Sequence, residues 1–353
     1  ATVTDIINTV AITSIQAQGL KKMKILVLNS GSSTIKYKLF DNLQEIISGT
    51  VEDVTNFNIE DICDFETLDA VGHRVVHGGE KFNKAALVTN TVIEDIRDLI
   101  PLAPLHNPLN LKYIEEIQFK YPNLPQVVVF DTAFHQTIDK THFTYPIPLE
   151  YYKQNHIRRY GFHGTSVEYI TKEFAKQKQK DIYEVNIIVL HLGNGASATL
   201  VKDGKSFDTS MGFTPLEGLM MGTRCGDIDP SIVTYLEDTN NLSSNEVIEI
   251  LNKKSGLKGI CGISDMREVL QQKDTLAFDM FCLRIQKYIG SYLIQVKKLD
   301  AIIFTGGIGE NCAEVRTKVC ENIDENIEIL VMPTNEELEI ASQTYDILNM
   351  LQL

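Results

Sequence analysis

The hydrophobic positions of this chain fall into short runs that lead into glycine-rich segments. Residues 24–28 are apolar and precede a turn-like stretch at 29–34, after which apolar and polar residues alternate at 35–39. A short apolar run bounded by turn residues is typical of a buried strand, and alternation is typical of a half-buried one. The same order recurs at residues 186–201, and a third apolar run leads into the glycines of 301–311. The pattern therefore predicts strands that end in glycine-rich turns.

Longer segments between these runs show helical periodicity. Apolar residues at 278–296 recur at three- and four-residue spacing, which predicts a helix with one side packed into a core. Ser-x-x-Glu at 243–246 and Thr-x-x-Glu at 334–337 resemble capping boxes, so we expect a helix to begin at each. The second follows an apolar run at 327–332, which places Glu336 in a first helical turn just beyond a strand.

The unit of strand, glycine-rich turn and strand occurs near the start and again near the middle of the chain, which indicates an internal duplication. A length of 353 residues also favours two domains, because single cores stop growing beyond about 250–300 residues. We therefore expect two α/β domains. We interpret residues 1–22 as an extension or added leader ahead of a start at Met23, with a short added helix as the alternative.

Composition narrows the classes of partner. The formal net charge of −14 argues against nonspecific nucleic-acid binding, which requires a basic face. No run approaches 18 apolar residues, so we expect no membrane span. Six cysteines lack a C-x-x-C spacing, and we interpret them as reduced thiols of a cytoplasmic protein. An anionic ligand would therefore be bound by local arginines, histidines and backbone N–H groups.

Polar residues of catalytic type gather in a few glycine- or proline-containing segments. These segments are Gly72–Gly79 with Arg74, Leu105–Pro108 with His106, Val127–Asp131, Arg158–Thr165 with His163, and Gly222–Asp229 with Arg224. Two separated arginines suit recognition of a carboxylate or a phosphate. An acid at the carboxyl end of a strand suits a metal, because ligands gather outside strand ends in open α/β sheets. No P-loop sequence is present. Together these segments predict a phosphoryl-transfer site.

The same segments resemble the acetate kinase family. The matching motifs are Asn29-Ser-Gly-Ser-Ser, Gly72-His-Arg-Val-Val-His-Gly-Gly79, Phe130-Asp-Thr-Ala-Phe-His135, Tyr160-Gly-Phe-His-Gly-Thr-Ser166, His191-Leu-Gly-Asn-Gly195, Thr214-Pro-Leu-Glu-Gly218, Met221-Gly-Thr-Arg224 and Pro333-Thr-Asn-Glu-Glu337. They follow the family's order from Met23 to the C-terminus, and as a set they are highly specific.

The resemblance implies an architecture and an activity. The fold would be two duplicated ribonuclease H-like domains, as in actin-like ATPases, with the active-site cleft between them. The first domain would comprise residues 23–150 with a returning C-terminal helix at 335–353, and the second, nucleotide-binding domain residues 151–334. The activity would be reversible, ATP-dependent phosphorylation of acetate with Mg²⁺, for which Mn²⁺ can substitute. A cytoplasmic homodimer is also implied.

The resemblance further assigns roles to individual residues. The catalytic set would be Arg74, His106, Asp131, His163 and Arg224, and the metal would lie near Asn29 and Glu336. Arg74 would also bind substrate, with an apolar pocket for the methyl group formed by Val76, Leu105, Phe162 and Pro215. The nucleotide would be bound by Lys36, His191, Leu192, Gly193, Asn194, Gly195, Asp265, Met266, Arg267, Gly307, Ile308, Gly309, Glu310 and Asn311.

The implied reaction needs no general base, because a carboxylate is already a nucleophile near pH 7. We therefore interpret Asp131 as a positioning group. The resemblance implies that His163 donates to the equatorial oxygens of the transition state. Val76 favours acetate, since propionate-preferring relatives have a smaller residue at this pocket position. One methylene is worth only about 1–3 kcal/mol in such a pocket, so propionate should be a poor but real substrate.

The sequence departs from the family pattern in four places. The intervals from Phe40 to Gly72 and from Asn311 to Pro333 are shorter than usual, Val167 replaces a common histidine, and Cys225 replaces a serine. Two alternatives to an acetate kinase remain. One is a propionate or butyrate kinase, and the other is a non-catalytic, actin-like ATP-binding protein. Retention of every charged group of the implied site argues against the second.

Overall fold

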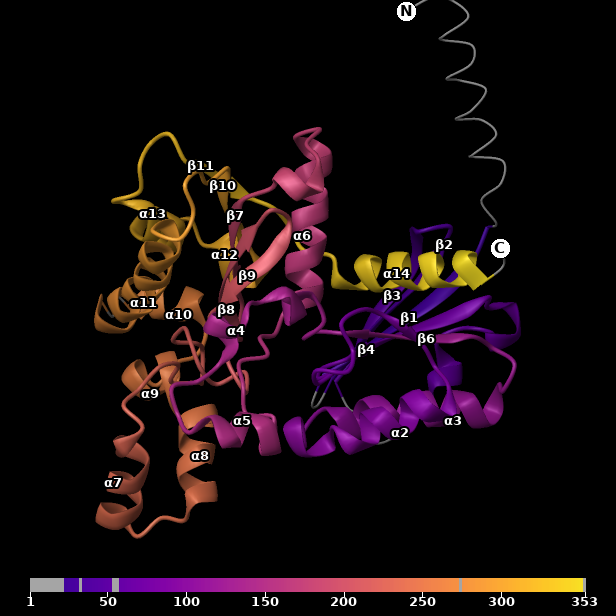
Figure 1. Ribbon diagram of the computed structural model, residues 1–353, viewed down its shortest axis with the longest axis horizontal. Helices are drawn as coiled ribbons and strands as arrows, with labels where there is room; N and C mark the ends of the chain where they lie inside the picture. The colour runs from indigo at the N-terminus through magenta and orange to yellow at the C-terminus, as the bar shows by residue number, and fades with distance from the viewer. Residues whose placement is uncertain (1–21, 32–33, 53–56, 273–274, 352–353) are drawn as a thin grey trace, which may run out of the picture.

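A computed structural model describes residues 22–31, 34–52, 57–272 and 275–351. The predicted extension at 1–22 lies outside this part, apart from Lys22. Figure 1 shows two lobes, each built on one β-sheet with helices against it. We call the lobe with the first strands the first lobe and the other the second lobe.

The sheet of the first lobe has six strands in the order β3-β2-β1-β4-β6-β5. They are β1 (Lys24–Ser30), β2 (Ile35–Asp41), β3 (Gln44–Val51), β4 (Ala70–Val75), β5 (Ala86–Leu87) and β6 (Gln126–Phe130). The first three form an antiparallel meander. Strands β4 and β6 then extend the sheet parallel to β1, and β5 is an antiparallel edge.

The second lobe repeats this plan in the order β11-β10-β7-β8-β9. Its strands are β7 (Ile187–Leu192), β8 (Ala196–Lys202), β9 (Lys205–Thr209), β10 (Ala301–Thr305) and β11 (Glu328–Val331). An antiparallel meander is again followed by two strands parallel to its first member. The predicted duplication and the predicted α/β fold class are confirmed.

Helices fill the intervals between strands. In the first half of the chain they are α2 (Asn90–Asp98), α3 (Asn107–Lys120), α4 (Lys140–Phe143), α5 (Leu149–Asn155) and α6 (Gly164–Gln177). In the second half they are α7 (Ser231–Asn240), α8 (Ser244–Lys253), α9 (Gly256–Cys261), α10 (Met266–Gln272), α11 (Thr275–Leu293), α12 (Gly306–Asn311), α13 (Ala313–Cys320) and α14 (Glu336–Leu351). Short 3₁₀ turns occur at Ile59–Asp61, Phe65–Thr67, Ile100–Leu102, Phe134–Thr137 and Ile182–Glu184.

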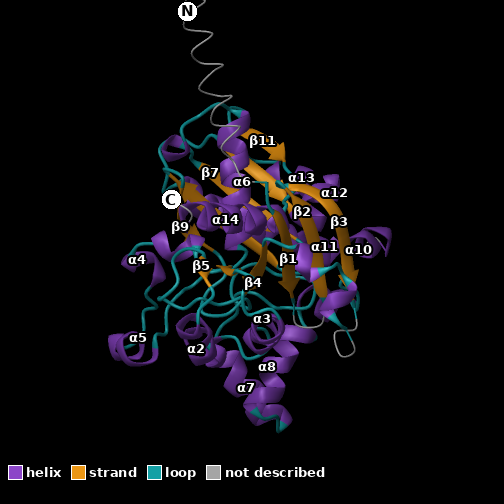
Figure 2. Cartoon of the chain, turned by 90° about the vertical axis from the view of Figure 1, so that its right-hand side faces the viewer, coloured by secondary structure: helices purple, strands orange, loops and turns teal. Residues whose placement is uncertain are grey.

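Strand β1 shows why the first sheet is covered on both faces. Ile25 and Val27 pack with residues of α14, whereas Leu26 and Leu28 pack on the opposite face with Tyr113 of α3. Successive strand residues point to opposite faces, so a continuous apolar run requires a partner on each side. Figures 1 and 2 show α14 on one side of the sheet and α2 and α3 on the other.

In the second lobe, α6 and α11 cover opposite faces of the sheet. Val167 and Phe174 of α6 pack against Ile187 and Val189 of β7. Phe281 and other apolar residues of α11 belong to the core on the opposite face, as the helical periodicity predicts. The apolar Val167, which replaces a common histidine, is fully buried in this packing.

Helix α14 returns to the first sheet and also contacts α6. At this junction Lys172 of α6 forms ion pairs with Glu168 of the same helix and with Glu339 of α14. The returning helix therefore joins the two lobes. This packing agrees with the predicted domain boundaries, which stay a prediction.

Two local expectations were wrong. Helix α14 is capped by Asn335 and not by Thr334, because the Asn335 side chain accepts the backbone N–H of Leu338 at 3.2 Å. The Thr334 hydroxyl instead bonds the Ser166 hydroxyl at 2.8 Å. The glycines after β10 form the short helix α12 rather than a turn. The predicted capping box at Ser243 and Glu246 is confirmed.

The contact between β4 and α14 yields a stability prediction. A β-carbon added at Gly72 would lie 2.6 Å from Thr344 Oγ1 and 2.9 Å from Ile340 Cγ2. Gly72→Ala should therefore lower the free energy of unfolding by about 1–3 kcal/mol through overpacking. In α11, a β-carbon at Gly290 meets nothing within 4 Å, so Gly290→Ala should be neutral or stabilising. Denaturant titration checks both, and equal stability of the two variants would contradict the packing argument.

Candidate active site

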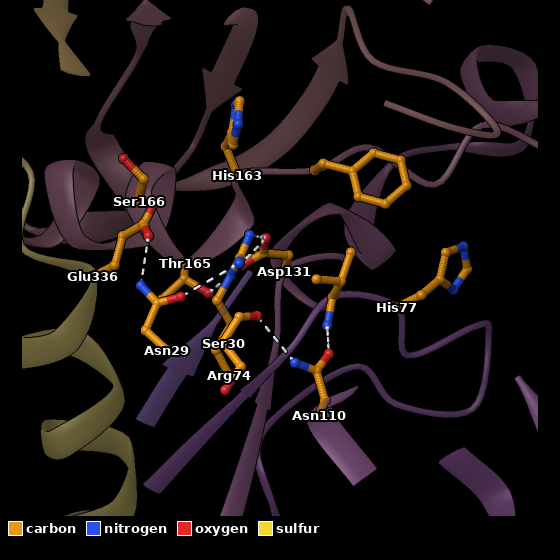
Figure 3. A network of polar contacts seen from close by, with 12 residues as sticks. Asn29, Ser30, Arg74, His77, Asn110, Asp131, His163, Thr165, Ser166 and Glu336 are labelled. Carbon is orange, nitrogen blue, oxygen red and sulfur yellow. Dashed lines mark hydrogen bonds and ion pairs between the residues drawn. The ribbon is translucent and has the colours of Figure 1, made fainter. Parts of the chain in front are cut away.

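The carboxyl ends of three parallel strands bring the first group of polar side chains together. Asn29 lies near the end of β1, Arg74 near the end of β4, and Asp131 directly after β6. Arg74 Nε donates to Asp131 Oδ2 at 3.0 Å, and a second guanidinium nitrogen contacts the same oxygen. Arg74 Nη1 also donates to Asn29 Oδ1 at 3.3 Å. Figure 3 shows Arg74 between these two partners.

Asp131 also ties this group to the second lobe. Its Oδ1 accepts the Thr165 hydroxyl at 3.1 Å, and its backbone carbonyl accepts the Gly164 N–H at 2.9 Å. A β-carbon at Gly164 would lie 2.2 Å from that carbonyl oxygen, so only glycine permits this approach. Asp131 is 1% exposed and both of its carboxylate oxygens have donors. Both contacts suit a positioning group, and this role of Asp131 stays a prediction.

Acidic side chains from α14 adjoin the same group. Asn29 Nδ2 donates to Glu336 Oε2 at 3.3 Å and to Glu337 Oε1 at 2.7 Å. Burial raises the pKa of Glu336 to about 7 against the opposing charge of Arg74. Carboxylate and amide oxygens suit Mg²⁺, which binds one or two carboxylates and keeps several waters. A cation here would stabilise the ionised form of Glu336, so these residues fit the predicted metal.

This fit does not extend to a metal site made wholly of protein ligands. Within the described ranges no group of three or more His, Cys, Asp and Glu residues is placed to hold an ion. Such a partial ligand set is typical of Mg²⁺ sites that are completed by substrate phosphates and water.

His163 occupies a left-handed backbone conformation, with φ of 59°, directly before α6. Its Nδ1 lies 3.0 Å from the Ser197 hydroxyl, and its ring stacks on His191 at a centroid distance of 4.2 Å. Burial, reinforced by the neighbouring His191 and the arginines, lowers the pKa of His163 well below its ordinary value. The ring is therefore neutral near pH 7, and it can donate a hydrogen bond from only one nitrogen.

Arg224 approaches His163 from another loop. A β-carbon added at Gly195 would lie 3.4 Å from Arg224 Nη1 and 3.5 Å from His163 Nε2, so both groups lie beside this glycine. Arg224 donates to the Pro215 carbonyl at 3.3 Å and contacts Met221 Sδ. In the part of the chain that the structure describes, no carboxylate pairs with it. It is a partly buried cation without a counter-charge.

Two cavities lie among these residues. The smaller, about 200 Å³, is lined by Asn29, Gly31, Thr34, Lys36, Arg74, His163, His191 and Glu336. The larger, about 530 Å³, is lined by Gly193, Asn194, Ser264, Asp265, Met266, Arg267, Gly307, Ile308, Asn311 and Cys312. Of the predicted catalytic and metal residues, Asn29, Arg74, His163 and Glu336 line the smaller cavity, whereas His106, Asp131 and Arg224 are not part of its lining. Most of the predicted nucleotide residues line the larger cavity.

Known proteins are similar to this chain in sequence and in fold. The chain matches the Acetokinase family over residues 55–337. The acetate kinase of Sulfurovum sp. (strain NBC37-1) is 45% identical over 395 aligned positions, which cover 93% of this chain and 100% of that relative. The structure of Porphyromonas gingivalis acetate kinase has a TM-score of 0.84 at 36% identity and covers 92% of this chain and 100% of its own. The chain belongs to the acetokinase family.

A structure described as a propionate kinase is equally similar. The protein from Francisella tularensis subsp. tularensis SCHU S4 has a TM-score of 0.86 at 42% identity and covers 91% of this chain and 98% of its own. The Sulfurovum alignment has more positions than this chain has residues, so that relative contains insertions that this family member lacks. The alignment length does not locate these insertions, so the two shortened intervals stay a prediction.

Some predicted nucleotide residues of this acetokinase lie away from the larger cavity. Lys36 and His191 line the smaller one. Leu192 is fully buried in the core, because it is the last residue of β7 and its side chain faces α11 and its neighbours. Gly309 is buried, and Glu310 accepts the Gly306 N–H at 2.9 Å, so its carboxylate turns back onto its own helix. A motif match shows where such residues lie along the chain, but it does not show the direction of their side chains.

The predicted apolar pocket is formed only in part. Val76 and Phe162 are buried and belong to one hydrophobic cluster, and Pro215 lies beside Arg224 through its carbonyl. Leu105 is 69% exposed, because it lies in the irregular segment before α3. His106 follows it, and burial lowers its pKa to about 4, with Arg74 and Arg224 both contributing. His106 therefore lies within electrostatic reach of both arginines.

Several residues that contact the site were missing from the predicted set. They are Thr165, Ser166, Ser197, His135, Glu337, Ser264 and Cys312. His135, for example, bonds the Ser206 hydroxyl at 2.7 Å and the Phe162 carbonyl at 2.9 Å, which holds the backbone that precedes His163. Proximity to a predicted motif could have pointed to Thr165, Ser166 and His135, and Ser264 directly precedes the predicted Asp265.

No helix among the described segments combines the length and apolar character that crossing a bilayer requires.

The space beside Gly195 leads to a prediction about turnover. A methyl group there would remain in ordinary contact distance of Arg224 and His163, so Gly195→Ala should fold normally. It would fill the space between the two groups, and small displacements at a reacting centre can cost roughly a hundredfold in rate. We expect kcat to fall by about that factor in a coupled kinase assay, with Gly290→Ala as the control. Near-normal turnover of Gly195→Ala would contradict this prediction, because it would show that no reacting group lies between Arg224 and His163.

Proposed function

We propose that this chain transfers the γ-phosphoryl group of ATP to the carboxylate of acetate, in a reversible reaction that requires Mg²⁺ or Mn²⁺. The observation that carries the proposal is Arg224, a partly buried cation that no carboxylate of the described residues pairs with, beside the neutral His163. A desolvated arginine gains most from an anionic partner. Membership of the acetokinase family supports the identity of that anion. We further propose a cytoplasmic homodimer with no nucleic-acid or membrane partner.

In this proposal ATP lies across the two cavities. The adenosine portion occupies the larger cavity, beside Asn194, Asp265 and Gly307. The phosphates extend to the smaller cavity, which Lys36 and Glu336 line together. Asn29 and Glu336 would hold Mg²⁺ beside the phosphates, where the ion would neutralise part of their charge.

Acetate attacks the γ-phosphorus in line, so that one carboxylate oxygen forms the new P–O bond while the bond to the ADP oxygen breaks. Arg74 and Arg224 hold the acid and the moving phosphoryl group, which offsets charge in the transition state. Asp131 keeps Arg74 in place and takes no proton, because Arg74 and Thr165 already occupy its oxygens. The neutral His163 donates a hydrogen bond to an equatorial oxygen.

The first test is formation of an acyl phosphate that hydroxylamine traps. With ATP and Mg²⁺, purified protein should convert acetate to the hydroxamate. Arg224→Ala should lose roughly 10²- to 10³-fold in kcat, because an electrostatic partner of the transition state is removed. Arg97→Ala is the matched control, since Arg97 is a surface residue paired with Glu94 and Glu115. Absence of hydroxamate from acetate, propionate and butyrate alike would sink the proposal.

Propionate is the alternative acid, and similarity to a propionate kinase structure favours testing it. Val76 is 4% exposed and packs near Phe162, so it limits the space for a longer acid. We expect kcat/KM for acetate to exceed that for propionate, and Val76→Ala to narrow the ratio by about tenfold. The measurement is kcat/KM across acid chain length. An unchanged ratio in the variant would mean that Val76 does not set the acid preference.

A further inference from the structure

The side chain of Ser197 contacts the ring of His163. We propose that its hydroxyl donates to His163 Nδ1 and thereby fixes the neutral ring with its proton on Nε2. Ser197 lies on β8, directly opposite His191 of β7 in the strand register. Its hydroxyl lies 3.0 Å from His163 Nδ1, and the residue is fully buried. The role of Ser197 rests on the proposed function, but the proton position does not.

The direction of this hydrogen bond follows from the satisfaction of buried groups. A serine hydroxyl has one proton and two lone pairs. If Ser197 accepted a proton from Nδ1, its own O–H would need another acceptor, and the described residues offer none. A buried donor without a partner costs about 1–3 kcal/mol. If Ser197 donates, both groups are satisfied, because Nδ1 then uses its lone pair.

The position of the single ring proton decides what His163 presents to substrate. Nε2 is the nitrogen beside Gly195 and Arg224. With the proton on Nε2, the ring offers an N–H to an incoming phosphoryl oxygen next to the guanidinium. With the proton on Nδ1, it would offer a lone pair to a negatively charged oxygen, which is repulsive. The serine therefore selects the productive tautomer before substrate binds, as preorganised sites require.

The neighbouring histidine shows why the argument is specific to Ser197. His191 Nδ1 lies 2.8 Å from the Ser166 hydroxyl, but this hydroxyl also lies 2.8 Å from the Thr334 hydroxyl. With two partners, Ser166 can donate to Thr334 and accept from His191, or the reverse. Its contacts therefore leave the His191 tautomer open. Within the described ranges the Ser197 hydroxyl has His163 as its one partner, and only one direction of the hydrogen bond satisfies it.

The direct test is the tautomer of His163 in the resting protein. Protein labelled with ¹⁵N-histidine is studied by long-range ¹H–¹⁵N NMR near pH 7 without substrate, and the His163 signals are identified by their loss in His163→Gln. We expect the Nε2–H pattern, with Nδ1 as a hydrogen-bonded acceptor. The Nδ1–H pattern would overturn the inference. Because this readout needs no turnover, it stands apart from the hydroxamate assay that tests the proposed function.

Kinetics of variants test the positioning role. Ser197→Ala should lower kcat roughly tenfold to a hundredfold while the KM values for acetate and ATP change little, because a donor aimed at the transition state is no longer held. Ser197→Thr keeps the hydroxyl and should restore most of the loss. The matched control is Ser210→Ala. It removes a buried hydroxyl that accepts the N–H of Ala198, the residue that follows Ser197 on β8. An equal loss of kcat in the control, or no rescue by threonine, would contradict the role.

Discussion

The ion pair between Arg74 and Asp131 is the interaction on which the rest of the site depends. It joins the ends of two parallel strands, and Asp131 extends it through Thr165 and Gly164 to the start of α6 in the second lobe. Breaking a buried pair by removing one partner leaves an uncompensated charge, which typically costs 3–5 kcal/mol. The same pair positions Asn29, and through it the acids of α14. One constraint therefore aligns both lobes and the residues that fit the metal.

The two arginines of the site differ in how far their charge is already neutralised. Arg74 is neutralised by Asp131, so its position is fixed before substrate arrives. Among the described residues Arg224 has a carbonyl and a sulfur as its partners and no carboxylate, so its charge remains available for an anion. In a protein with a net charge of −14, such local positive charge must be kept from neighbouring carboxylates. The carbonyl of Pro215 orients Arg224 without neutralising it.

Much of this arrangement could be predicted from the sequence. Apolar runs indicate strands, glycines indicate the turns after them, and ligands gather at such strand ends. Asp131 was predicted from the apolar run that it ends, and Arg74 from its glycine-bounded segment. Ser197 could not be predicted, because its importance arises from a contact with a residue 34 positions away. Leu192 and Leu105 were assigned to the site by motif alone. Leu192 is buried and Leu105 is exposed, because a motif does not determine the direction of a side chain. Asn335 replaced Thr334 as the cap because Thr334 bonds Ser166 instead.

The return of α14 to the first sheet has a consequence for the order in which this protein matures. Ile340, Ala341 and Tyr345 complete the core beneath β1, and Asn29 meets Glu336 across a sequence separation of 307 residues. Contacts of such separation form late, because closing long loops costs entropy before any contact rewards it. The first lobe to leave the ribosome is thus the last to close its core. The group of side chains that contains Asn29 and Glu336 therefore stays incomplete until residues 336–351 have been synthesised.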